Sequence, residues 1–328
     1  MRQVPANWWL SWLLGGRTQL VEHRALLNRI NVFPVADADT GSNLSATLGW
    51  AADSAGMADD PTLALAARAA LRGARGNSGT LLAVWLLGLA RELGPVGELE
   101  PVTTGIPEEN SALTPAFLAS AFKRAARDAR SALSQPAEGT MLTVMQAIGQ
   151  VPPADDWLGY TSQLLQGAET AVRETAQASH ARNGWVDAGA LGFLLVLVAL
   201  ATELNGSAPT KTYADLLEES PAPSWPNALP PFSQRSKKSG STVEVMCDIH
   251  LPVLEASQLR SALDAVGDSV SIAQVEAGNE ALWAIHVHTP TAADALTVLE
   301  AAGEPLNVRI SNLAPGDSEP ALAGCSHD

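Results

Sequence analysis

The chain has 328 residues and a formal net charge of −15, and 46% of its residues are apolar while 17% are charged. This composition provides packed cores for about two domains of ~150 residues each and excludes a chain that is disordered throughout. The negative charge disfavours nucleic acid and anionic membrane surfaces as partners, although bound metal ions would still let such a protein hold nucleotide phosphates. The two cysteines, Cys247 and Cys325, cannot build a disulfide framework, so we expect a reduced, cytoplasmic protein.

Residues 1–205 are expected to form a helical domain. The apolar start at 8–14 predicts a first helix rather than a signal peptide. The longest apolar run, 191–200, has about half of the ~20 residues that cross a bilayer, so it predicts a buried helix and no integral membrane segment. Several helices are apolar on nearly all sides, which is typical of a bundle. The later predicted helices span 61–75, 77–93, 116–133, 141–150, 160–179 and 188–204.

A second, smaller domain is expected at 241–313. Proline-rich stretches at 95–115 and 206–240 predict a surface loop and an interdomain linker. Residues 314–328 predict a flexible tail. After residue 240 the pattern predicts an α+β domain in the order β-α-β-β-α-β, which is that of a ferredoxin-like, split βαβ unit. Its predicted strands and helices span 242–251, 254–266, 269–275, 282–289, 292–302 and 306–311.

A carboxylate pair, Asp37 and Asp39, lies in the segment INVFPVADADTGSNL at 30–44. Mg²⁺ prefers carboxylate oxygens together with waters and substrate phosphates, so Asp-x-Asp can supply half of a magnesium site. The polar residues and backbone amides that open the following helix could then contact phosphate oxygens. A solvated turn in which an aspartate caps the helix explains the same residues equally simply.

Three further clusters of small residues, at 74–80, 138–144 and 186–192, also precede predicted helices. Each presents unpaired backbone N–H groups and the positive end of a helix dipole. One such cluster alone indicates ordinary capping. Four of them in one helical domain, one with a carboxylate pair, favour a shared site for a polyphosphate and metal ions at one end of a bundle.

The four motifs NVFPVADADTGSN, ARGNSGTLL, EGTMLTVMQA and VDAGALGFL occur in an order and spacing that resemble the nucleotide-binding (DhaL) domain of dihydroxyacetone kinase. They resemble in particular the branch found in bacterial fatty-acid kinase catalytic subunits. The resemblance covers about residues 10–204. It implies an all-α antiparallel barrel of eight helices that holds ATP at one end through two Mg²⁺ ions.

The resemblance also implies roles for individual residues. Asp37 and Asp39 would be the catalytic carboxylates. The metal-binding positions correspond to Asn31, Asp37 and Asp39. The phosphate-contacting positions correspond to Thr40, Asn43, Ser78 and Gly79. The rest of the nucleotide pocket corresponds to Gly139, Thr140 and Asp187.

The chain departs from the family at Ala38, because the family usually has Pro-Asp-Gly-Asp where this chain has Ala-Asp-Ala-Asp at 36–39. If Ala38 must adopt a positive φ, or let a phosphate approach closely, its methyl group will lower the affinity for nucleotide. Because both carboxylates and the glycine-serine segments are present, we expect binding of ATP and Mg²⁺.

The expected activity is that of an ATP-dependent kinase of the fatty-acid kinase type. Phosphoryl transfer needs positioning and charge neutralisation more than covalent help. A fatty-acid carboxylate is already ionised at neutral pH and needs no general base, and the four motifs contain no histidine. The resemblance implies that a separate fatty-acid-binding protein presents this acceptor and that the product is an acyl phosphate. Family members are often dimers, so a homodimer is an expected assembly.

Two other functions fit parts of the sequence. A dihydroxyacetone (glycerone) kinase subunit would share the nucleotide domain but fits the second domain poorly. A nucleotide-binding pseudokinase or scaffold without turnover is compatible with Ala38. It is also compatible with the lack of a counterpart here to the family's third, C-terminal domain. The chain would then be a shortened homologue, or that role would lie in another polypeptide.

The second domain contains a candidate zinc site. His286 and His288 share one face of a predicted strand, and Cys247 lies in another strand that would converge with them if the two are neighbours. A buried structural cysteine beside two surface histidines explains the same pattern. The middle domain of fatty-acid kinase catalytic subunits is similar, with a cysteine strand and a later HVHT strand. This resemblance implies zinc binding by Cys247, His286 and His288, with His250 as a candidate fourth ligand.

Overall fold

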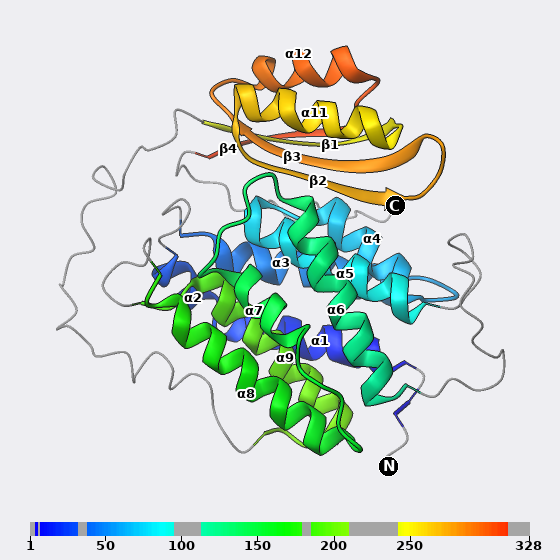
Figure 1. Cartoon of the computed structure of the whole chain (residues 1–328), viewed down its shortest axis with the longest axis vertical. Coiled ribbons are helices and arrows are strands. Elements are labelled where there is room, and N and C mark those ends of the chain that lie inside the picture. Colours follow the sequence, from blue (N-terminus) through cyan, green and yellow to red (C-terminus); the bar gives the residue numbers. More distant parts are fainter. Residues whose placement is uncertain are drawn as a thin grey trace, which may run out of the picture.

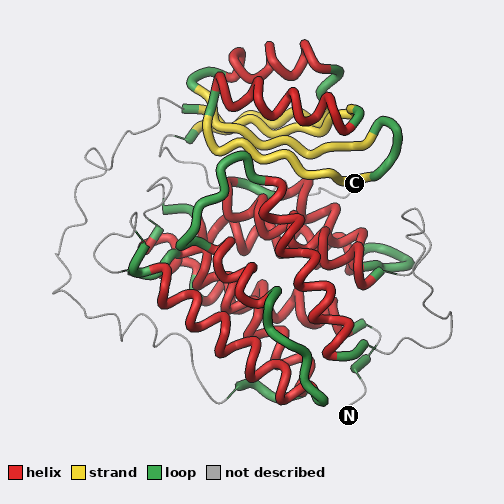
Figure 2. Tube along the Cα trace, in the orientation of Figure 1, coloured by secondary structure: helices red, strands yellow, loops and turns green. Residues whose placement is uncertain are grey.

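The structure is a computed structural model that describes residues 4–5, 7–31, 38–94, 113–178, 185–209 and 242–313. Asp37, residues 95–112, most of the predicted linker and the predicted tail lie outside the described residues. The described ranges form a helical N-terminal domain, followed by a small domain with a four-stranded sheet and two helices (Figures 1 and 2).

Every helix expected from the sequence is present, with ends that differ by a few residues. Thr62 caps α4 by accepting a hydrogen bond from the Leu65 amide, and Thr114 caps α6, whose first residue is Pro115. His23 alone separates α1 from α2. The helices are α1 (Trp8–Glu22), α2 (Arg24–Ile30), α3 (Thr40–Gly56), α4 (Leu63–Gly73), α5 (Gly76–Leu93), α6 (Pro115–Ala132), α7 (Met141–Ile148), α8 (Trp157–Thr175) and α9 (Ala188–Asn205).

Fully buried aromatic rings lie at the centre of the helical domain. Trp85 on α5 contacts Trp12 on α1, Phe122 on α6 and Phe193 on α9, with ring centroids 4.9–6.2 Å apart. Among the described helices, α9 is long and apolar enough to cross a membrane, with a mean hydropathy of 1.8, and 72% of it is buried inside the structure. The aromatic centre of the domain is thus built from side chains of α1, α5, α6 and α9, and the other helices add buried residues around it.

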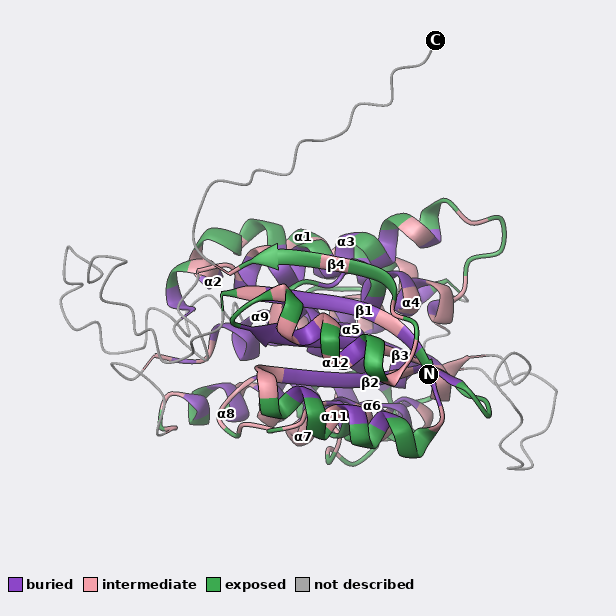
Figure 3. Ribbon diagram, turned by 90° about the horizontal axis from the view of Figure 1, so that it is seen from above, coloured by how far each residue is buried: buried purple, intermediate pink, exposed green. Residues whose placement is uncertain are grey.

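The small domain contains the elements in the predicted β-α-β-β-α-β order, which is confirmed. Its strands pair antiparallel in the order β2-β3-β1-β4, as in a split βαβ unit. Helices α11 and α12 cover one face of the sheet (Figure 1), and β4 is an exposed edge strand (Figure 3). The elements are β1 (Val243–Leu251), α11 (Val253–Val266), β2 (Asp268–Glu276), β3 (Ala281–Thr289), α12 (Ala292–Ala302) and β4 (Leu306–Asn312).

The other face of the sheet packs against the helical domain (Figure 2). Met246, Ala273 and Val275 from the sheet belong to the same buried cluster as the helical core. The Ser134 amide donates a hydrogen bond of 3.0 Å to the carbonyl of Val270, and this contact continues the sheet edge beyond β2. Both faces of the sheet are therefore covered along β1, β2 and β3, and polar side chains on the inner face lie between the two domains.

Candidate functional site

The N-termini of α7 and α9 meet at Asp187. This residue caps α9, where its Oδ1 accepts a hydrogen bond of 2.8 Å from the Ala190 amide. The same oxygen accepts a second bond of 3.1 Å from the Met141 amide, the first residue of α7. At α7 itself, Thr140 caps the helix and Gly139 has a φ of 75°. Ordinary helix capping therefore accounts for Thr140 and Asp187. The Asp187 side chain also links the helix starts of two of the four motifs.

The N-termini of α3 and α5 meet around Asn43. A Cβ atom on Gly76 would lie 2.4 Å from the Asn43 side-chain nitrogen, and Gly76 has a φ of 59° that favours glycine. A Cβ on Gly79 would lie 2.7 Å from the Thr47 hydroxyl. These glycines are needed because α5 approaches α3 without room for a side chain.

The start of α5 also meets the start of α9, because a Cβ on Gly189 would lie 3.4 Å from the Ser78 hydroxyl and 3.3 Å from Met141 Cβ. The four helix starts named by the sequence motifs are therefore brought together. In that group Thr40 and Asn43 are buried, while Ser78 is partly exposed.

The carboxylate motif lies at the start of α3. Asp39 occupies the N-cap position of α3, but its side chain makes no capping hydrogen bond. The simple explanation of a capping aspartate therefore does not account for Asp39. Asn31 is buried at the end of α2, and Asp37 lies outside the described residues.

Ala38, between the two aspartates, has a φ of 59°, so it adopts the positive φ at which the family's glycine would be unstrained. We expect Ala38→Gly to raise the free energy of unfolding by about 1 kcal/mol, because glycine removes the cost of a Cβ in this region. Urea unfolding followed by circular dichroism would show a higher midpoint at an unchanged slope. Ala38→Ser, which keeps a Cβ, serves as the control, and an equal midpoint for both variants would contradict the prediction.

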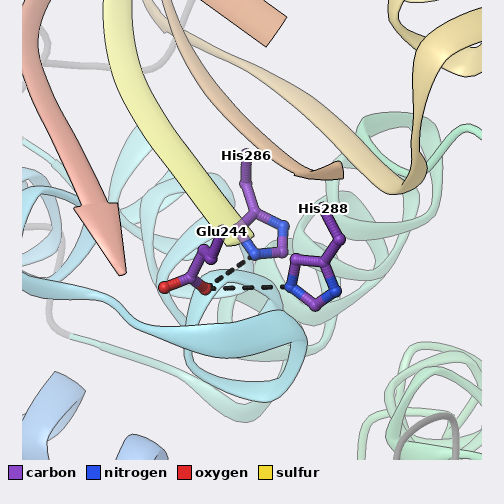
Figure 4. Close-up of side chains that lie close together, drawn as sticks. All are labelled: Glu244, His286 and His288. Carbon is purple, nitrogen blue, oxygen red and sulfur yellow. Dashed lines mark hydrogen bonds and ion pairs between the residues drawn. The ribbon is translucent and has the colours of Figure 1, made fainter. Parts of the chain in front are cut away.

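A second cluster joins Glu244 on β1 to His286 and His288 on β3 (Figure 4). All three are buried, and their ligand atoms lie within 4.8 Å of one another. Nε2 of His286 is 2.9 Å from Oε1 of Glu244, and Nε2 of His288 is 3.9 Å from the same oxygen. The register explains this geometry, because Glu244 pairs with His288 and the next inward residue, Met246, pairs with His286.

The charge states in this cluster suit a metal ion. Burial alone would raise the pKa of Glu244, but hydrogen bonds with His286 and His288 and the Gly76 amide outweigh it, so its pKa lies well below the usual range. Burial lowers the pKa of His288. An ionised carboxylate and a neutral imidazole are the forms that bind zinc.

The prediction that Cys247 joins the two histidines is wrong. Cys247 pairs with Ile285 and lies on the opposite face of the sheet, in the core beneath α11 and α12. Burial, followed by the charge of Asp248, raises the pKa of its thiol to about 12. His250 pairs with Leu282 at the other end of β1 and is exposed, so it does not complete this cluster either.

Sequence reasoning missed Glu244, although a signal was present. Along β1 the residues Val243, Val245, Cys247 and Ile249 form one apolar set, whereas Glu244 belongs to the alternate set. On β3 the apolar set contains Ile285 and Val287. Matching the apolar set of β1 to that of β3 would have placed Cys247 on the face of Ile285 and Val287, and Glu244 on the face of the histidines.

The histidine cluster directly contacts a phosphate-binding candidate segment. The Gly76 amide, at the first residue of α5, donates a hydrogen bond of 2.8 Å to Oε1 of Glu244. Next to it, the Asn77 side chain donates to the Ser269 hydroxyl at 3.2 Å. The two candidate sites are thus linked through the N-terminus of α5.

The chain thus combines a helical N-terminal domain with a small four-stranded sheet domain. The DAK2 domain model matches residues 34–202, just over half of the chain, and the model of the FakA-like middle domain of fatty acid kinases matches residues 241–319. The chain belongs to the DAK2 domain family, and its second part belongs with the FakA-like middle domains.

Curated relatives match nearly all of this chain. Protein YloV of Bacillus subtilis is 25% identical over 331 residues, covering 95% of this chain and 56% of that protein. An uncharacterized protein of Staphylococcus saprophyticus is 23% identical over 328 residues, covering 95% and 55%. The chain thus spans about half the length of these relatives. Among solved structures, the dihydroxyacetone kinase from C. freundii in complex with AMP-PNP and Mg²⁺ has a TM-score of 0.42 and 19% identity, covering 61% of this chain and 35% of that one.

Proposed function

We propose that this chain is an ATP- and Mg²⁺-dependent phosphotransferase of the fatty-acid kinase type. It transfers the γ-phosphoryl group of ATP to a fatty-acid carboxylate that a separate binding protein presents, and the product is an acyl phosphate. The observation that carries this proposal is that four helix N-termini lie together. Beside them, the side chain of Asp39 makes no capping hydrogen bond. The match of the second domain to a fatty acid kinase middle domain favours this acceptor over dihydroxyacetone.

In this proposal the helical domain, residues 1–205, is an antiparallel barrel of the family's type, although its described residues form nine helices rather than the expected eight. Residues 206–240 link it to a ferredoxin-like domain at 241–313. The N-termini of α3, α5, α7 and α9 favour the phosphates through their helix dipoles. The amides of Gly76, Met141 and Ala190 already donate to Glu244 or Asp187, so the phosphates contact other backbone amides at these helix starts. Asn31, Asp37 and Asp39 hold two Mg²⁺ ions, which neutralise the charge of the phosphates when bound. Asn43, Ser78 and Gly79 keep α3, α5 and α9 close enough to form one site.

We also propose that Glu244, His286 and His288 hold a zinc ion. Two imidazoles and one carboxylate are a normal zinc ligand set, and their burial and spacing fit it. Because Glu244 also accepts the Gly76 amide hydrogen bond, an ion here would fix the start of α5 relative to the sheet.

The test is the double variant Asp37→Asn, Asp39→Asn, compared with Asp59→Asn, which removes one exposed carboxylate beyond the end of α3. The double variant is expected to weaken binding of Mg²⁺·ADP at least about tenfold, which corresponds to ~1.4 kcal/mol. The control should bind as the unmodified chain does. Calorimetric titration measures this affinity, and acyl phosphate formed with a fatty-acid-binding protein can be trapped with hydroxylamine.

Two outcomes would count against the proposal. Unchanged Mg²⁺·ADP affinity in the double variant would show that the metal site is wrong. Binding of the nucleotide by the unmodified chain without acyl phosphate formation, with the partner and fatty acid present, would favour a pseudokinase.

A further inference from the structure

A cavity of about 270 Å³ lies between the start of α5 and the strands β1 and β4. Its lining contains none of Asn43, Ser78 and Gly189, the residues at which the helix starts meet. Glu244 forms part of its wall, so the cavity lies beside the segment that joins the two candidate sites. Its lining residues are Arg75, Glu244, Met246, Arg309, Ile310 and Ser311.

The cavity concentrates positive charge in a protein whose net charge is −15. Arg75, at the N-cap of α5, and Arg309, on β4, both line it. Among the described residues, neither guanidinium has a carboxylate oxygen within ion-pair distance, and Arg309 donates instead to the Met246 sulfur at 3.6 Å. Burial lowers the pKa of Arg309, the charge of Glu244 raises it, and the nearby charge of Arg75 lowers it. An anion between these two guanidiniums would relieve their repulsion.

The two carboxylates whose charges act on Arg309, those of Glu244 and Asp248, each accept hydrogen bonds from other groups. Glu244 uses Oε1 for His286 and for the Gly76 amide. Asp248 accepts a hydrogen bond of 2.8 Å from the Asn307 side chain. The cavity therefore combines two cationic side chains with a single carboxylate, that of Glu244, among the described residues of its wall.

The remaining walls are partly apolar. Met246, the half-exposed Ile310 and Ser311 line the cavity together with the two arginines. A phosphate or nucleotide gains little from apolar walls, whereas an amphipathic carboxylate matches both parts. Guanidinium groups bind carboxylates through two parallel hydrogen bonds.

We propose that this cavity binds the carboxylate end of an aliphatic acid. Arg75 and Arg309 hold the carboxylate, and Met246 and Ile310 contact the first methylene groups. The volume lies below the roughly 300–1,000 Å³ of sites that enclose whole drug-sized ligands, so the rest of a long chain stays outside. This inference rests on the proposed function and places the acceptor beside the start of α5.

The test is titration of octanoate carrying a ¹³C-labelled carboxyl group into the full chain, followed by the NMR shift of that carbon. Octanoate should bind, and Arg309→Gln and Arg75→Gln should each weaken its binding at least about tenfold, as expected for loss of a bidentate contact. Arg309→Lys should restore only part of the affinity, because lysine keeps the charge but not the two parallel bonds. Arg72→Gln is the control. It removes one positive charge at the exposed end of α4, outside the cavity, and should bind octanoate as the unmodified chain does.

Three results of the octanoate and phosphate titrations would overturn the inference. They are no octanoate binding by the unmodified chain, equal binding by Arg309→Gln, and tighter binding of inorganic phosphate than of octanoate at the same residues. Mg²⁺·ADP affinity, measured on the same samples, separates this inference from the proposed function. Arg309→Gln should leave that affinity unchanged, and a parallel loss would assign the cavity to the nucleotide and also overturn the inference. Absence of Mg²⁺·ADP binding in the unmodified chain would instead contradict the proposed function.

Discussion

Replacing Glu244 with alanine is expected to remove zinc binding and to destabilise the contact between the two domains. The substitution deletes one of the three buried ligand side chains and leaves His286 and the Gly76 amide without their buried partner. Removing one partner from a buried charged pair costs about 3 kcal/mol or more. Metal content after dialysis against zinc and the urea unfolding midpoint measure the two effects.

Three further variants separate these effects. Glu244→Gln keeps an oxygen that can accept the Gly76 amide, so it should lose zinc while losing only about 1 kcal/mol of stability. Cys247→Ala should retain its zinc, because Cys247 lies on the other face of the sheet. Glu280→Ala, in the exposed turn between β2 and β3, should change neither quantity. Full zinc content in Glu244→Ala, or its loss in Cys247→Ala, would refute this ligand assignment.

Trp85→Ala is expected to cause the largest loss of stability in the helical domain. The Trp85 ring is fully buried and contacts aromatic side chains of three other helices. Truncation of a buried tryptophan costs about 3–5 kcal/mol, because it removes apolar contacts and leaves a cavity. Urea unfolding should be followed by far-ultraviolet circular dichroism, since the substitution itself changes the fluorescence.

Trp85→Phe provides the matched comparison. The Trp85 Nε1 atom has no hydrogen-bond partner among the described residues, so phenylalanine loses ring volume without breaking a bond. In contrast, Trp12 Nε1 donates a bond of 3.0 Å to the carbonyl of Val196, and Trp12→Phe should cost about 1 kcal/mol more than Trp85→Phe for that reason. A loss below ~1 kcal/mol in Trp85→Ala would contradict this account of the core.

Local sequence signals predicted most element positions, and their failures have local causes. The helix predicted at 160–179 begins at Trp157 in the structure, because Asp156 caps it by accepting a bond of 2.7 Å from the Gly159 amide. An aspartate followed by an apolar run is a recognisable helix start, so this end could have been predicted. The helix ends near Thr175, where no comparably strong stop signal is present in the chain.

The sequence by itself determined the two-part architecture, the order of the strands and helices, and the common face of His286 and His288. Those features follow from short-range periods of 3.6 and 2 residues and from capping residues. The apolar alternation along β1 and β3 already places Glu244, rather than Cys247, on the face of the histidines. Only the tertiary structure decided that β1 pairs with β3 in the register that brings these three side chains together, and that the helical domain covers this face. It also decided that Arg75 and Arg309, far apart in the chain, line one cavity. Such long-range contacts are set by the packing of whole elements, which no local pattern encodes.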